Sequence, residues 1–269
     1  MQYDPIKSFL GKLFNVSPIL RVLFYKLLDI LLLRTWHIKR EIRKIKKQFP
    51  KDALILDAGS GFGQYVYYLS TLSRTWTIKG VDVKAEQVAD CNQFFAKLGY
   101  GNRVTFEEAD LTTHVEPAKY NMILSVDVME HILEDVFVFN NFSQSLKPGG
   151  VLLVSTPSDK GGSDVHDEHE GSFIGEHVRD GYNFVEIEEK LIGSGFSKVE
   201  VAYSYGVPGK ISWKLSMKYP ILLVNAHKIF FVVLPFYYLL TFPFVLILNY
   251  IDVAFKHHSG TGLIVKAWK

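Results

Sequence analysis

Leu54-Ile55-Leu56-Asp57-Ala58-Gly59-Ser60-Gly61-Phe62-Gly63 is the stretch that decides the fold of this chain. A short run of Leu and Ile that leads into glycines is typical of a strand buried on both faces of a parallel sheet. Glycines let the backbone approach a ligand closely, and the start of the helix that follows favours an anion. The spacing differs from the G-x-G-x-x-G turn of dinucleotide-binding proteins, because Gln64 stands where the third small residue would be.

Outward from this turn, short apolar runs alternate with helical patterns as far as residue 205. The expected strands cover 53–57, 77–83, 103–109, 122–127, 151–156 and 198–205, with one more at 260–269. Helical periodicity covers 63–72, 85–98, 134–146 and 183–194, and one or two helices occupy 18–49 before Pro50. This alternation predicts an α/β fold, with a doubly wound, mostly parallel sheet and helices on both faces.

Composition bounds the class of protein. The chain has 269 residues, of which 48% are hydrophobic and 22% charged, so it can bury a core and global disorder is excluded. The single cysteine, Cys91, excludes a disulfide framework and a Cys-based zinc site. The formal charge of +2 hides an asymmetry: residues 34–51 hold eight Lys or Arg against Glu41, a net +7, which leaves −5 for the rest. Such a block indicates nucleic acid, anionic lipid or a solvated helix face.

Acidic and small polar residues stand where the expected strands end. Asp57 closes the first strand, and Asp82 closes the second, 25 residues further on, where a carboxylate can accept both ribose hydroxyls. The third strand ends near Asp110, and the fourth ends in Ser125-Val126-Asp127. The turn 147–150, Lys-Pro-Gly-Gly, precedes the fifth strand.

This ordered series of motifs resembles the class I S-adenosylmethionine-dependent methyltransferases, over about residues 53–205 and the last strand. The resemblance includes the ubiquinone-biosynthesis O-methyltransferases and related quinone methyltransferases. It implies an open sheet of seven strands, S-adenosylmethionine as cofactor, and ligand binding at the carboxyl ends of the strands. The implied cofactor site comprises Asp57, Gly59, Ser60, Gly61, Gly63, Asp82, Val83, Asp110, Leu111 and Ser125.

Within that resemblance the residues have separate expected roles. The glycine loop would hold the methionine part, with Ser125 facing the methionyl end. Asp82 would bind the ribose, with Val83 beside the adenine. Asp110 would accept from the adenine amine, with Leu111 against the ring. For the glycines alone, a tight structural turn is the alternative.

Asp127, Glu130 and His131 form a D-x-x-E-H arrangement after the fourth strand. The arrangement resembles a segment of the ubiquinone-biosynthesis O-methyltransferases that holds a divalent ion near the substrate hydroxyl. A metal such as Mg²⁺ would lower the pKa of a phenol and orient its oxygen. The alternative is a metal-free site in which His131 caps the next helix and Glu130 faces the methionine amine. In either case Glu130 and His131 are the expected groups for deprotonating an oxygen acceptor.

A polar loop at 163–177 follows the fifth strand, where a lid over the substrate would lie. It contains His166 and His169 among several acidic residues, and either histidine is a candidate general base because imidazole titrates near neutral pH. A solvated acidic lid with incidental histidines is the alternative.

An apolar insertion interrupts the pattern before the last strand. Residues 229–248 carry no charge, a length that would normally suggest a transmembrane helix. The last strand must nevertheless return to the sheet, so the segment has to come back to its starting side. Pro235 and Pro243 predict a broken helix. We therefore expect 211–252 to form helices that lie in, or dip into, one leaflet, with the basic block attracted to anionic headgroups. A dimer interface and a cap over an apolar substrate tunnel are the alternatives.

Three regions result: N-terminal amphipathic and basic helices at 1–50, a methyltransferase domain at 51–205 plus 259–269, and a membrane-associating insertion at 206–258. The sequence predicts a peripheral or monotopic enzyme on the cytoplasmic side of a membrane. Its expected acceptor is a hydroxyl of a phenolic, quinone-like or lipid-linked molecule. C-methylation of a quinone-like ring, a non-catalytic membrane-attached module and a homodimer through the insertion stay open. Nucleic acid is not an expected partner, because Ser125-Val-Asp-Val stands where a base-binding Asn/Asp-Pro-Pro-Tyr motif would be.

Overall fold

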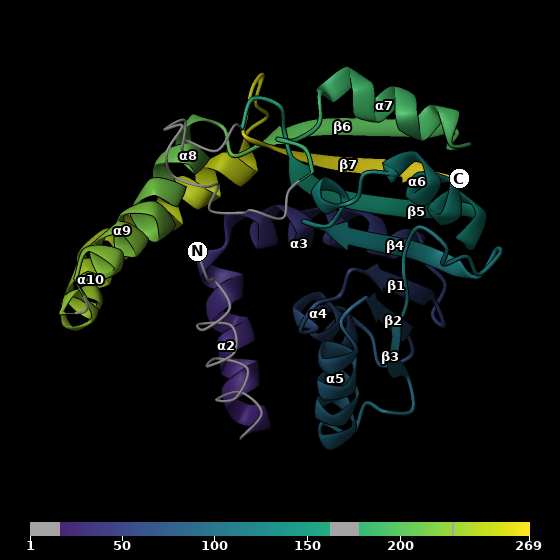
Figure 1. The fold of residues 1–269 in the computed structure, drawn as a ribbon, viewed down its shortest axis with the longest axis horizontal. Helices are drawn as coiled ribbons and strands as arrows, with labels where there is room; N and C mark the ends of the chain where they lie inside the picture. The colour runs from purple at the N-terminus through teal and green to yellow at the C-terminus, as the bar shows by residue number, and fades with distance from the viewer. Residues whose placement is uncertain (1–16, 162–177, 228) are drawn as a thin grey trace.

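The computed structural model describes residues 17–161, 178–227 and 229–269. A sheet of seven strands in the order β3-β2-β1-β4-β5-β7-β6 forms its centre (Figure 1). All strand pairs are parallel except those that β7 makes with β5 and β6. The strands are β1 Leu54–Ala58, β2 Thr77–Asp82, β3 Val104–Glu108, β4 Tyr120–Val126, β5 Leu146–Pro157, β6 Lys198–Ser204 and β7 Gly262–Trp268. The predicted fold class is confirmed.

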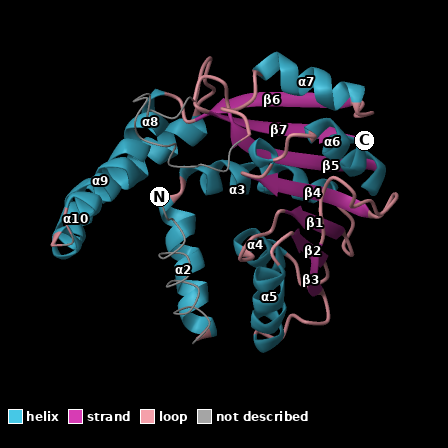
Figure 2. Ribbon diagram, viewed as in Figure 1, coloured by secondary structure: helices cyan, strands magenta, loops and turns pink. Residues whose placement is uncertain are grey.

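Helices cover both faces of the sheet (Figure 2). Successive side chains of β1 point to opposite faces of the sheet. Ile55 accordingly belongs to one apolar cluster and its neighbour Leu56 to the other. The first cluster includes residues of α4 Gln64–Leu72 and α5 Ala85–Lys97, and the second includes residues of α6 Asp135–Ser145 and α7 Phe184–Gly193. Each face of the sheet therefore has a core of its own.

Between residue 17 and the sheet, the structure describes two helices, as the periodicity predicts. They are α2 Pro18–Leu31 and α3 Leu33–Ile45, followed by the 3₁₀ turn η1 Lys46–Gln48. The non-helical backbone of Leu32 separates them, with φ −89° and ψ 109°. Tyr25 from α2 and Ile38 and Ile42 from α3 are fully buried in the same cluster as α4 and α5. Helices α2 and α3 are thus packed against the domain.

The insertion forms a helical hairpin that extends away from the sheet (Figure 1). One arm is α8 Val207–Trp213, the π-helical η3 Lys214–Lys218 and α9 Tyr219–Ala226, and the other is α10 Phe230–Ala254. Tyr237 and Tyr238 donate their hydroxyls to carbonyls of the opposite arm, those of Leu215 (2.7 Å) and Ser216 (2.8 Å). The chain returns to the sheet as β7, so the expected return to the starting side is confirmed.

The prediction that Pro235 and Pro243 break the helix is wrong, because α10 is one helix of 25 residues that contains both prolines. A proline inside a helix lacks an N–H, and its ring crowds the carbonyl four residues earlier. Packing against a neighbouring helix and hydroxyl side chains can nevertheless hold the helix together. Thr241 donates its hydroxyl to the Tyr237 carbonyl at 2.9 Å, between the two prolines.

A buried polar cluster fixes the base of the hairpin to α3. Asp252, fully buried on α10, lies 2.8 Å from Nε2 of His37 and accepts from the backbone N–H of Gly209 at 2.9 Å. Arg40 donates to the Val253 carbonyl. The hairpin is therefore attached to the domain through the helix that also carries Arg34.

Candidate functional site

The strand order reverses between β1 and β4, which places a crevice at their carboxyl ends where doubly wound sheets bind ligands. The loop after β1 has left-handed φ values at Gly59 (79°), Gly61 (51°) and Gly63 (82°). A Cβ added to Gly59 would lie 2.3 Å from Cγ2 of Val128. Glycine is therefore required by close packing as well as by backbone conformation.

Asp82, at the end of β2, holds this loop in place. Its Oδ2 accepts from the Gly61 N–H at 2.8 Å, and its Oδ1 accepts from the Lys84 N–H at 3.0 Å. A carboxylate has about four acceptor positions, so both oxygens keep capacity for ligand hydroxyls. Asp82 is thus part of the loop's architecture as well as a candidate ligand group.

The residues predicted to contact adenine lie at the same edge of the sheet. Val83 is exposed after β2, while Asp110 and Leu111 follow β3, Asp110 exposed and Leu111 buried. Oδ1 of Asp110 accepts from the N–H and hydroxyl of Thr112, at 2.9 and 2.8 Å. The structure brings these positions together, and their adenine contacts stay predictions.

Buried polar atoms without a hydrogen-bond partner in the described part of the chain include three on β1, β4 and the glycine loop: Oδ2 of Asp57 and the hydroxyls of Ser60 and Ser125. Asp57 on β1 pairs in register with Leu124 on β4, so Ser125 lies on the adjacent strand beside it. Burial, with a smaller contribution from the charge of Asp82, raises the pKa of Asp57 to about 7. Unsatisfied buried groups are costly, and these three fit a ligand with polar groups and a cationic amine.

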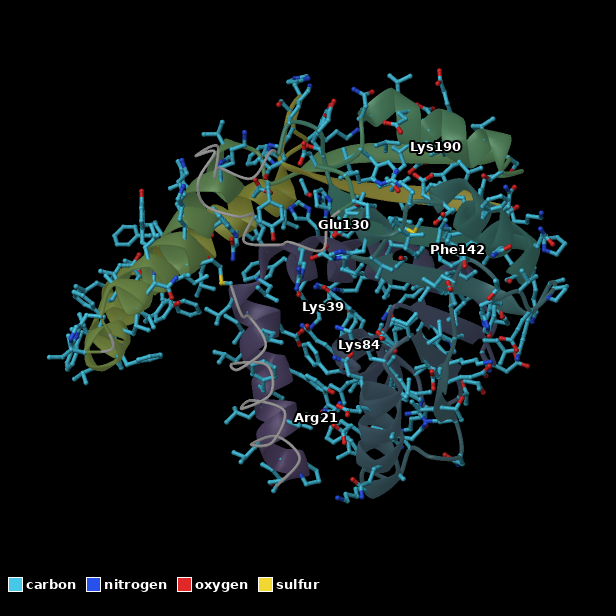
Figure 3. The ribbon with its side chains drawn as sticks, in the orientation of Figure 1. Arg21, Lys39, Lys84, Glu130, Phe142 and Lys190 are labelled. Carbon is cyan, nitrogen blue, oxygen red and sulfur yellow. The ribbon has the colours of Figure 1, made fainter. Side chains whose placement is uncertain are left out.

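The N-terminal helix α2 contacts the outer side of the glycine loop, which the sequence did not predict. Arg21 is 5% exposed and donates to the Phe62 carbonyl at 2.7 Å and to Sγ of Cys91 at 3.0 Å. Tyr25 donates its hydroxyl to the same carbonyl. Figure 3 shows Arg21 on α2. No local pattern signals these contacts, since 41 residues separate Arg21 from Phe62.

A second group of residues gathers around Arg34, at the start of α3, and joins the predicted site residue Asp127 to two residues that the sequence did not place at the site. Its guanidinium forms an ion pair with Asp127, and its backbone N–H donates to the Tyr205 hydroxyl at 3.0 Å. Asp127 and Tyr205 both have φ of 53°, a conformation that L-residues rarely adopt and that often marks functional sites. Burial raises the pKa of Tyr205 to about 12 and also raises that of nearby Tyr65, so both phenols are neutral at pH 7.

Glu130 lies in the 3₁₀ turn η2 Met129–His131 after β4 (labelled in Figure 3). It is 1% exposed, and its Oε2 accepts the Thr156 hydroxyl at 3.1 Å. Burial raises its pKa above the ordinary value, with opposing effects from backbone and side-chain hydrogen bonds and nearby cations. A buried carboxyl with a raised pKa is suited to accept a proton.

The predicted metal set of Asp127, Glu130 and His131 is not assembled. Asp127 is neutralised by Arg34, and Glu130 is turned inward to Thr156. Across residues 17–161, 178–227 and 229–269, no three His, Cys, Asp or Glu side chains lie close enough together to hold a metal ion. The donor set therefore does not fit a divalent ion. Arg34 on α3 already pairs with Asp127, the position that a metal ion would need. The lid histidines His166 and His169 lie outside the described residues.

Comparisons with known proteins identify the family of the chain. A family model described as "Methyltransferase domain" matches residues 50–203. Phosphoethanolamine N-methyltransferase 1 of Arabidopsis thaliana is 30% identical over 102 residues, 38% of this chain and 20% of that protein. The ubiquinone biosynthesis O-methyltransferase of Leptothrix cholodnii is 28% identical over 104 residues, 38% of this chain and 43% of that protein.

A solved structure of Haemonchus contortus phosphoethanolamine N-methyltransferase 2 in complex with S-adenosyl-L-methionine superposes with a TM-score of 0.60. Its sequence is 21% identical, and the match covers 86% of this chain and 52% of that one, so it supports the fold alone. The chain spans less than half the length of these curated relatives. The resemblance drawn from the motif series is confirmed by the family match.

Proposed function

The chain belongs to the methyltransferase domain family, and on that premise we propose that it is an S-adenosylmethionine-dependent methyltransferase. The observation that carries the proposal is the set of unpartnered polar atoms of Asp57, Ser60 and Ser125 beside a glycine loop held by Asp82. These groups fit an amino-acid moiety next to a ribose. When bound, the cofactor supplies a methyl group on a sulfonium, which is already electrophilic.

The chain's own residues have distinct tasks in this proposal. Asp57 and the two serines orient the methionine part, and Asp82 receives ribose hydroxyls. Arg21 and Tyr25 hold the loop from outside through the Phe62 carbonyl. Positioning the acceptor in line with the methyl group then supplies much of the rate.

For the acceptor we propose a hydroxyl, with Glu130 as the group that removes its proton. The raised pKa of this buried carboxyl favours proton uptake at Oε1 or Oε2, while Thr156 fixes its orientation. Arg34, held by Asp127 and Tyr205, would position the acceptor near the carboxyl end of β4. The two relatives named above differ in acceptor, an amine in one and a hydroxyl in the other by their names, so the acceptor is part of the proposal.

We further propose that the hairpin attaches the enzyme to a membrane and that the acceptor is lipophilic. Phe236, Leu239 and Leu240, in the half of α10 that is farther from the sheet, are 67%, 75% and 72% exposed. By length and composition α10 could cross a bilayer, since its most apolar stretch of 18 residues has a mean hydropathy of 2.3. Only 6% of that stretch is buried inside the protein. A helix this apolar and this uncovered is a liability in water, whereas a lipid leaflet would cover it.

The first experiment tests cofactor binding and catalysis. Calorimetry with S-adenosylhomocysteine should show binding that Asp82→Ala abolishes. Membrane extracts incubated with labelled methyl donor should yield a labelled lipid-soluble product. Absence of binding by the pure protein would overturn the enzyme proposal and favour a non-catalytic module.

The second experiment tests membrane attachment by liposome flotation. Wild-type protein should float, and Leu239→Lys/Leu240→Lys should not. The matched control is Val185→Lys/Ile192→Lys on α7, where the side chains are 56% and 48% exposed. It should float like wild type, and both variants should keep S-adenosylhomocysteine binding. Wild-type protein that stays soluble and monodisperse without detergent would refute the membrane proposal and favour the dimer alternative.

A further inference from the structure

A surface cavity lies where the base of the hairpin meets the basic helix α3. Its volume is about 500 Å³, and its lining includes Trp36, Lys39, Arg40 and Arg43 from α3 with Tyr250 and Val253 from α10. It is separate from the crevice at the ends of β1 and β4, which is formed by other residues. Figure 3 shows Lys39 on α3.

The charge in this cavity is positive. Its lining includes three cations, Lys39, Arg40 and Arg43, and one acid, Asp29. Asp29 forms an ion pair with Lys39, so the two arginines supply the excess positive charge. Arg40 donates to the Val253 carbonyl, and Arg43 donates Nε to the Lys39 carbonyl at 3.1 Å. Among the described residues neither arginine forms an ion pair with a carboxylate. Guanidinium groups bind phosphate through two parallel hydrogen bonds, so this pair is suited to a phosphate.

The cavity also borders the apolar surface of the hairpin. Tyr250 is 69% exposed, and one turn toward the tip Ile247 is 58% exposed on α10. Trp36, on the other side of the cavity, donates its indole N–H to the Ile30 carbonyl at 3.1 Å. Tyr and Trp side chains concentrate at the level of lipid headgroups. The basic cavity thus lies at the boundary between the apolar hairpin and the charged helix.

Resting on the proposed membrane attachment, we propose that this cavity binds the phosphate of an anionic phospholipid headgroup in the leaflet that holds the hairpin. Arg40 and Arg43 are the phosphate ligands. Trp36 and Tyr250 flank the headgroup, and the acyl chains lie along the exposed side of α10. The bound lipid fixes α3, and with it Arg34, relative to the membrane surface.

Flotation on vesicles of phosphatidylcholine alone, and with added phosphatidylglycerol, tests the site. Phosphatidylglycerol should strengthen binding of the wild type. Arg40→Gln/Arg43→Gln should lose about 25-fold of that binding, since each basic residue near the surface contributes about fivefold. Lys46→Gln/Lys47→Gln removes the same charge from the same basic block outside the cavity and should lose less than about threefold.

Arg40 also supports the hairpin base, so Arg43→Gln is the variant that separates binding from folding. It should lose about fivefold on anionic vesicles, while Arg43→Lys, which keeps the charge, recovers part of the loss. All variants should bind S-adenosylhomocysteine and float on neutral vesicles as the wild type does.

Several results would overturn the site. Equal losses for the two double variants would indicate diffuse charge. A melting-temperature rise with inorganic phosphate that Arg40→Gln/Arg43→Gln removes, combined with unchanged vesicle binding, would indicate a small-anion site. Wild-type flotation on neutral vesicles with no gain from phosphatidylglycerol would refute the lipid site alone. Failure to float on either kind of vesicle would refute the membrane proposal as well.

Discussion

Substituting Asp57 by Asn should stabilise the ligand-free protein in a pH-dependent way. Burial raises the pKa of Asp57 from 3.8 to about 7. The folded state therefore binds more protons than the unfolded state between these values, and stability falls as pH rises through that window. Above pH 7 the full penalty is present, about 4 kcal/mol. Asn resembles the protonated acid and cannot ionise, so the variant avoids the penalty.

About 3 kcal/mol of the difference in unfolding free energy between Asp57→Asn and the wild type should develop between pH 5 and pH 8. For a chain of this size the gain in melting temperature from Asp57→Asn should therefore be larger at pH 8 than at pH 5, by roughly 5–10 °C. Thermal unfolding followed by circular dichroism measures it. Ser125→Ala is the matched control: it changes a buried polar group at the same place without an ionisable group, so its effect should not vary with pH.

The same substitution should weaken cofactor binding. At pH 8 the ionised carboxylate of Asp57 would face the ammonium group of the ligand, and a charge-assisted hydrogen bond contributes about 1.5–3 kcal/mol. Calorimetry with S-adenosylhomocysteine should show a loss on the order of tenfold or more. A melting-temperature gain that is equal at pH 5 and pH 8 would refute the reasoning, because Asp57 would then not be desolvated as the structure indicates.

Four further outcomes are expected. Arg34→Gln should raise the acceptor KM and lower kcat in steady-state assays while calorimetric S-adenosylhomocysteine binding stays unchanged. Equal losses of catalytic activity and of S-adenosylhomocysteine affinity would place Arg34 at the cofactor. Glu130→Gln should lower methyl transfer at least about 100-fold at unchanged cofactor affinity, and near-full activity would move the base elsewhere. Arg21→Ala should lower the free energy of unfolding by about 2 kcal/mol, since the Phe62 carbonyl and Sγ of Cys91 both lose a buried charged donor; an unchanged denaturant midpoint would contradict this. EDTA should leave turnover unchanged, and restoration of a lost rate by Mg²⁺ would show that Asp127, Glu130 and His131 bind a metal ion after all.

Much of the fold could be predicted because its signals are local. Runs such as 54–58 alternate between the two apolar clusters, and the glycine loop needs conformations that only glycine adopts readily. The order of strand-end residues then placed Asp57, Asp82 and Ser125 at one edge, because parallel strands share their carboxyl ends. Even the return of the hairpin followed from the need to pair the last strand.

Tertiary structure alone decided what those residues contact. The ion pair that occupies Asp127 comes from Arg34, 93 residues away, which in the sequence is one cation within a basic block. Likewise Arg21 reaches the glycine loop from a helix whose docking no periodicity specifies, and α10 continues through two prolines because the opposite arm packs against it. Backbone periodicity and turn chemistry are properties of neighbouring residues. Charge pairing, burial and the pKa of a carboxyl depend on which distant segment packs against it.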